Sequence, residues 1–124
     1  MAKRILIIDD ERDMQVYMAT LFRKAGYETA VAANGEEGLR KVPDFKPHLI
    51  TLDLLMPRKS GVMAFESLRT APETREIPVV VVTGLAQNKE LLRSGVRPPE
   101  AVVDKPIDRE ALLRTVEELL GADD

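Results

Sequence analysis

The chain has 124 residues, 21 acidic and 18 basic side chains, a net charge of −3 and no cysteine. This length is typical of one domain, so we expect residues 1–124 to form a single domain. Its lysines and arginines do not form the basic stripe that nucleic-acid backbones require, so direct nucleic-acid binding is not expected. The absence of a long apolar run and of a signal sequence predicts a cytoplasmic protein outside the membrane.

The chain begins with a strand, a helix and a second strand. A continuous apolar run predicts a strand at residues 5–8, of the kind that helices cover on both faces. Apolar side chains then recur at helical spacing from Met14 to Ala25, and Gly26 is typical of the residue that follows a helix. A weaker strand follows at residues 29–32.

A short helix and a buried strand come next. Asn34, with Glu37 three residues later, forms a capping pattern at the start of the helix, which we expect Pro43 and Pro47 to close. Residues 49–52 form a mostly apolar run with β-branched members and predict a buried strand.

The second half of the chain continues the alternation of helices and strands. We expect a helix at 62–68, a strand at 79–82, a helix at 86–94, a strand at 101–103 and a last helix capped by Asp108. Gly95 and Pro98 should end the helix at 86–94 early.

Five strands that alternate with five helices predict an α/β fold with a parallel sheet and helices on both of its faces. The strands at 5–8, 49–52 and 79–82 are rich in aliphatic residues and should be central. The weaker strand at 29–32 should lie at an edge.

Polar residues follow four of these strands: Asp9 and Asp10, Asp53, Thr83, and Lys105. Each has an ordinary structural explanation, such as a helix cap, an Asx turn, a strand-end hydroxyl or a solvated lysine. The carboxyl ends of parallel strands share one edge of the sheet, however, where ligands bind, so we expect all five to converge. His48 has no plausible partner in this set and is interpreted as structural.

Three neighbouring carboxylates predict a cation site. Each close pair repels by roughly 3–4 kcal/mol at an effective dielectric constant near 20, and Lys105 would offset this only in part. Oxygen ligands without cysteine or histidine suit Mg²⁺. We expect Asp9, Asp10, Asp53 and a backbone carbonyl to bind it. We also expect a cis peptide bond between Lys105 and Pro106, because the lysine must turn back towards the site immediately after a strand.

These residues resemble the receiver domain of two-component response regulators over essentially the whole chain. The resemblance is carried by Asp9-Asp10, the run from Asp53 to Pro57 with Gly61, Thr83-Gly84 and Lys105-Pro106. It implies a flavodoxin-like five-stranded parallel sheet in the order 2-1-3-4-5.

The resemblance also implies a function. Asp53 would accept a phosphoryl group from a sensor histidine kinase or a phosphotransfer protein, and the main-chain carbonyl of Leu55 would join the Mg²⁺ ligands. Lys105 would bind a phosphoryl oxygen, and Thr83 would move towards the phosphate and so switch the binding of an unknown downstream protein. Such a domain is not an enzyme beyond catalysing its own phosphorylation and dephosphorylation.

Two departures and two alternatives stand beside this interpretation. Val102 lies where many receivers have a mobile aromatic residue, and Pro98-Pro99 replaces the usual Gly-Ala pair, so output should not use an aromatic rotamer switch. One alternative is a pseudo-receiver that never takes phosphate. The other is a haloacid-dehalogenase-like Mg²⁺ phosphohydrolase, which normally carries an aspartate where this chain has Leu55.

Overall fold

The computed structural model describes residues 2–54, 60–83 and 95–121. Five parallel strands form one sheet in the order β2-β1-β3-β4-β5, which confirms the predicted fold class and strand order. The strands are β1 (Arg4–Ile8), β2 (Glu28–Ala32), β3 (Leu49–Asp53), β4 (Val79–Thr83) and β5 (Ala101–Asp104). The helices are α1 (Arg12–Lys24), α2 (Gly35–Phe45), α3 (Ser60–Thr70) and α5 (Arg109–Leu120). The helix predicted at 86–94 lies outside the described residues.

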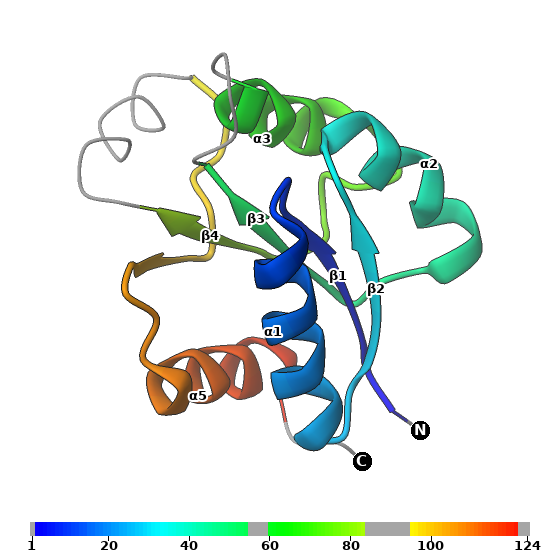
Figure 1. Ribbon diagram of the computed structural model, residues 1–124. Coiled ribbons are helices and arrows are strands. Elements are labelled where there is room, and N and C mark those ends of the chain that lie inside the picture. The colour runs from blue at the N-terminus through cyan, green and yellow to red at the C-terminus, as the bar shows by residue number, and fades with distance from the viewer. Residues whose placement is uncertain (1, 55–59, 84–94, 122–124) are drawn as a thin grey trace.

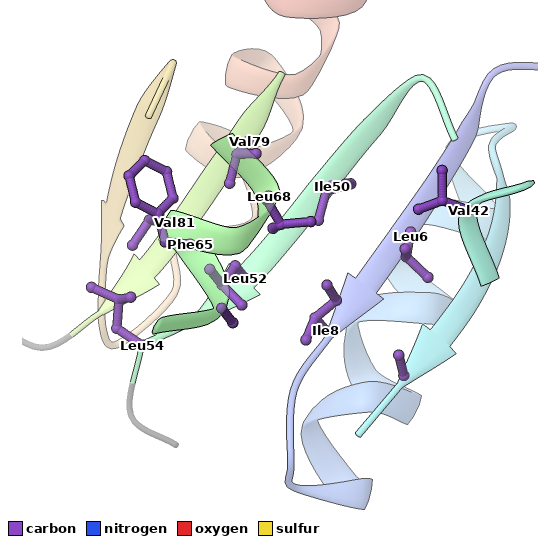
Figure 2. Close-up of a cluster of buried hydrophobic side chains, with 12 residues drawn as sticks. Leu6, Ile8, Val42, Ile50, Leu52, Leu54, Phe65, Leu68, Val79 and Val81 are labelled. Carbon is purple, nitrogen blue, oxygen red and sulfur yellow. The ribbon is translucent and has the colours of Figure 1, made fainter. Parts of the chain in front are cut away.

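Helices cover both faces of the sheet, with α1 and α5 on one face and α2 and α3 on the other (Figure 1). Successive side chains of a strand point to opposite faces, so each apolar strand supplies both layers of the core. Figure 2 shows the α2 and α3 layer, in which Phe65 and Leu68 lie over Leu52 and Val81. Strands buried in this way on both sides explain why their apolar runs lack polar alternation.

The helix ends follow their predicted caps. The Asn34 side chain accepts a hydrogen bond from the Glu37 backbone N–H at 2.8 Å. Asp108 accepts one in the same way from the Ala111 N–H at 3.2 Å. Gly26 follows α1 with a φ of 99°, a left-handed conformation that glycine adopts without strain.

The predicted end of α2 at Pro43 is wrong, because the helix continues through this proline to Phe45. A proline in the last turns removes one backbone donor, and the buried Val42 side chain holds this part of the helix against the core. Lys46, the residue that follows the helix, has a φ of 53° and donates its N–H to the Val42 carbonyl at 2.8 Å. Pro47 does lie beyond the end.

His48 joins the start of β1 to the residue before β3. The His48 ring Nδ1 accepts a hydrogen bond from the Arg4 backbone N–H at 3.0 Å, and the His48 backbone N–H donates to the Arg4 carbonyl at 2.8 Å. His48 lies at the amino ends of the strands, away from the acidic residues, in agreement with its interpretation as structural.

Arg69, at the end of α3, is buried and organises the chain that enters β5. Its guanidinium donates to the carbonyls of Ile77, Arg97 and Pro98 and to the Glu100 carboxylate. Burial alone would raise the pKa of Glu100, but hydrogen bonds from Arg69 and from the Val79 N–H, with the charges of Arg69 and Arg97, outweigh it and lower this pKa. A buried arginine is satisfied here because almost every donor direction meets an acceptor.

Strand β2 forms one edge of the sheet. The Glu28 N–H donates to the Lys3 carbonyl, and the Ala32 carbonyl accepts the Asp9 N–H, at the two ends of β1. The backbone polar groups of Thr29 and Val31 therefore point away from β1, towards the edge of the sheet. The Lys41 ammonium of α2 reaches over this edge and donates to the Val31 carbonyl. None of the described helices is long and apolar enough to cross a membrane.

Two buried threonines make a matched test of hydrogen bonding in the core. Thr51 in β3 is 1% exposed, and its hydroxyl has no hydrogen-bond partner among the described residues. Thr74 is equally buried, but its hydroxyl donates to the Leu68 carbonyl at 2.6 Å. Because an unpaired buried hydroxyl is costly, Thr51→Val should raise the free energy of unfolding by about 1 kcal/mol, whereas Thr74→Val should lower it by about 1–2 kcal/mol. Urea unfolding measures both values. Equal losses in the two variants would contradict this account of Thr51.

Candidate functional site

The parallel sheet brings the predicted polar residues to one edge. Asp9 follows β1, Asp53 ends β3, Thr83 ends β4 and Lys105 follows β5. The strand ends are held together by backbone hydrogen bonds, including one of 3.0 Å from the Lys105 N–H to the Thr83 carbonyl. The Lys105–Pro106 bond is cis, as predicted.

Three carboxylates meet at this edge. One oxygen from each of Asp9, Asp10 and Asp53 lies within 4.8 Å of the others. Asp9 and Asp53 are 4% and 2% exposed, whereas Asp10 faces solvent. The Lys105 ammonium donates to Asp53 Oδ2 at 3.0 Å and neutralises part of the cluster. An oxygen cluster of this kind, open on one side, could hold a hard divalent cation.

Burial raises the pKa of the Asp9 carboxyl to about 7. The hydrogen bond from the Glu11 backbone N–H opposes the rise, the charge of Asp53 adds to it, and Lys105 opposes it. The charge of Lys105 thus offsets only part of the effect of burial and of Asp53 on Asp9. A second cation would favour the ionised form of Asp9.

Thr83 is fully buried at the end of β4, opposite Asp104 in the register with β5. Its position next to the strand that carries Asp53 agrees with the sequence expectation, since β3 and β4 are neighbours. Leu55, whose main-chain carbonyl the resemblance to receiver domains implies as a Mg²⁺ ligand, lies outside the described residues.

Gly61, which the sequence placed in the same motif, is required by packing. A Cβ at this position would lie 2.5 Å from the Leu54 carbonyl oxygen and 2.7 Å from the Leu54 Cα, both of them rigid backbone atoms. The first turn of α3 can therefore approach the end of β3 closely only because residue 61 has no side chain.

Sequence reasoning missed Gln15, a residue of α1. Its side-chain amide donates to the Asp9 carbonyl at 2.7 Å and lies 3.5 Å from the Ala32 carbonyl. Position on the first turns of the helix, six residues after Asp9, was the only sequence signal for this contact.

A cavity of about 280 Å³ opens beside Lys105, between α1 and the residues after β5. It is lined by Met14, Tyr17, Lys105, Pro106 and Ile107. Tyr17, in the cavity wall, is 39% exposed, which is high for a large side chain. Val102 on β5 is also exposed, at 43%.

Comparisons with known proteins agree with this geometry. The family model described as response regulator receiver domain matches residues 5–117. Protein Rrf1 of Nitratidesulfovibrio vulgaris is 32% identical over 98% of this chain and 85% of its own. Protein PilH of Pseudomonas aeruginosa is 31% identical over 95% of this chain and 98% of its own. The crystal structure of a response regulator signal receiver domain from Bermanella marisrubri superposes with a TM-score of 0.85 at 29% identity, covering 98% of this chain and all of that one.

The raised pKa of Asp9 predicts how stability depends on pH without divalent cations. The folded state holds the Asp9 proton more tightly than the unfolded state does, so this group stabilises the fold below about pH 4, and the contribution is lost as the pH rises through about 7. Asp9→Asn stays neutral and can still accept from the Glu11 N–H, so at pH 8 in EDTA it should unfold at higher urea than wild type. The difference should shrink towards pH 4, as urea titrations across this range will measure. A difference in stability that does not change with pH would contradict its attribution to the protonation of Asp9.

Proposed function

Because this chain belongs to the response regulator receiver family, we propose that Asp53 accepts a phosphoryl group from a phosphohistidine of a sensor histidine kinase or a phosphotransfer protein. Receiver domains are signalling modules of two-component systems that interact with such partners, and we propose that residues 1–124 form one of them. The observation that carries the proposal is the nearly buried Asp53 carboxylate, placed between Lys105 at 3.0 Å and the acidic pair.

The surroundings of Asp53 suit phosphoryl transfer. This reaction needs an aligned oxygen nucleophile and positive charge around the transferred group, and little other covalent help from the acceptor protein. One Asp53 oxygen bonds to phosphorus as the bond from phosphorus to the histidine nitrogen breaks, which leaves an acyl phosphate on the protein. The Lys105 ammonium, already bonded to Asp53, can turn to a phosphoryl oxygen.

The acidic residues fit Mg²⁺ as the required metal. Asp9, Asp10 and Asp53 supply only oxygen ligands, and the pKa of Asp9 is raised by burial and by the neighbouring Asp53 charge, an effect that a bound cation would oppose. In this proposal they bind Mg²⁺ together with the main-chain carbonyl of Leu55. When bound, the ion supplies positive charge that neutralises the phosphoryl oxygens.

Thr83 is the proposed sensor of phosphorylation. A phosphoryl group on Asp53 would add negative charge and acceptor oxygens at the end of the strand next to β4. The Thr83 hydroxyl could donate to one of these oxygens only in the phosphorylated state, which would shift the chain that follows β4 and switch the binding of a downstream protein.

The two alternatives have less support. A pseudo-receiver would be expected to lack one of the acidic pair, the acceptor or the lysine, and Asp9, Asp10, Asp53 and Lys105 are all present. A haloacid-dehalogenase-like phosphohydrolase would need a second aspartate at position 55, which is leucine. We therefore expect no turnover of phosphate esters.

The surface of α1 beside the cavity is the proposed docking site for the kinase or phosphotransfer protein. In this proposal the partner that carries the donor histidine contacts α1 at the exposed Tyr17, which lines the cavity together with Lys105. Tyrosine is one of the residue types that most often anchor protein interfaces.

Asp53→Asn tests the acceptor directly. Incubation with a small acyl phosphate and Mg²⁺ should add the mass of one phosphoryl group to wild type and none to the variant, because an amide is not an oxyanion nucleophile. Intact-mass spectrometry measures the product, and peptide mapping under mild acid locates it. Asp44→Asn, which changes an exposed aspartate of α2, is the control and should be phosphorylated like wild type. Full labelling of Asp53→Asn would refute the proposal.

Tyr17→Ala tests the docking site separately from the chemistry. Phosphotransfer from a cognate histidine kinase should slow about tenfold, because an aromatic anchor of the interface is lost. Phosphorylation by the small donor should be unchanged. Met63→Ala is the matched control, since Met63 is 62% exposed on α3, on the other face of the sheet. The transfer of labelled phosphate from the kinase measures both rates. Equal slowing in the two variants would argue against docking at α1.

A further inference from the structure

Gln15 links the ends of two strands to the first turns of α1. Side chains in a helix lean towards its amino end, which carries the Gln15 amide back over the end of β1. There its nitrogen donates to the Asp9 carbonyl at 2.7 Å and lies 3.5 Å from the Ala32 carbonyl. The Ala32 carbonyl also accepts the Asp9 N–H at 3.0 Å, so both polar backbone groups of Asp9 are held.

The two members of the acidic pair are fixed in different ways. Asp9 is held through its side chain, because its Oδ1 accepts the Glu11 backbone N–H at 2.9 Å. Among the described residues, no hydrogen bond or ion pair holds the Asp10 side chain, which is exposed. The direction of the Asp10 carboxylate therefore depends on the backbone that leads into it.

The Gln15 amide acts on that backbone. The Asp9 carbonyl belongs to the planar peptide unit that joins Asp9 to Asp10, so a hydrogen bond to this oxygen limits rotation on both sides of the unit. Without the amide, the carbonyl would have to find water, and the peptide unit could turn. The Asp10 carboxylate would then point towards Asp9 and Asp53 for a smaller fraction of the time.

We infer that Gln15 is a positioning residue for the cation site, which aims the Asp10 carboxylate by holding the peptide unit between Asp9 and Asp10. This inference rests on the proposed function, since it concerns the same Mg²⁺ site. Groups that orient metal ligands without touching the metal typically change affinity by about 10- to 100-fold when they are removed. Gln15 acts on the backbone of a ligand, so we expect an effect near the lower limit.

The test is Gln15→Met, which keeps the length of the side chain and removes its donor. Isothermal titration calorimetry with Mg²⁺ alone should give a Kd about tenfold higher than that of wild type. Urea unfolding in EDTA, measured in parallel, reports any general loss of stability. Leu120→Ala is the control, because it removes core contacts of the last turn of α5, which is far from Asp9, Asp10 and Gln15 in the sequence. It should lower stability and leave the Mg²⁺ Kd unchanged.

The outcomes separate this inference from the proposed function. A Mg²⁺ Kd of Gln15→Met within twofold of wild type would overturn the inference and leave the cation site intact. A rise in Kd that Leu120→Ala reproduces would also overturn it, because general destabilisation would then suffice. Failure of wild type to bind Mg²⁺ at millimolar concentrations would overturn the proposed cation site, and the inference with it.

Discussion

The repulsion among Asp9, Asp10 and Asp53 is the constraint on which the site depends. Three carboxylates with oxygens within 4.8 Å would drive the strand ends apart if the sheet did not hold them. The fold resists this with backbone hydrogen bonds between the strand ends, the lysine that follows β5 and two apolar layers that bury the strands on both faces. Stability supplied by the core thus maintains an acidic site that is unfavourable by itself, as is common at functional sites.

The sequence was sufficient to predict the sheet and most of the site. Uninterrupted aliphatic runs such as Val79 to Val82 identify strands covered on both faces, and the polar residue after each run then falls on a shared edge. This reasoning placed Asp53 and Lys105 together although they are 52 residues apart in the chain. It needed only the periodicity of the strands and their parallel direction.

Contacts decided by tertiary packing were not predictable in this way. In the sequence Pro43 predicts the end of α2, but local propensity is overridden when neighbouring side chains such as Val42 are buried in the core. The buried Arg69 reads in sequence as an ordinary charged residue near a helix end, because its carbonyl partners come from a distant loop. Gln15 was missed for the same reason, since a glutamine amide that binds backbone carbonyls leaves no pattern in the sequence.

The Lys41 ammonium on the edge of β2 has a consequence for how molecules of this protein behave towards one another. An unprotected edge strand is a template on which a strand of another chain can add, and such additions lead to open-ended aggregates. A strand added to β2 would have to form hydrogen bonds with the backbone groups of Thr29 and Val31 that point away from β1. The Val31 carbonyl already accepts a hydrogen bond from the charged Lys41 side chain. Desolvating that charge would be costly, so Lys41 disfavours the addition of a further strand at the β2 edge.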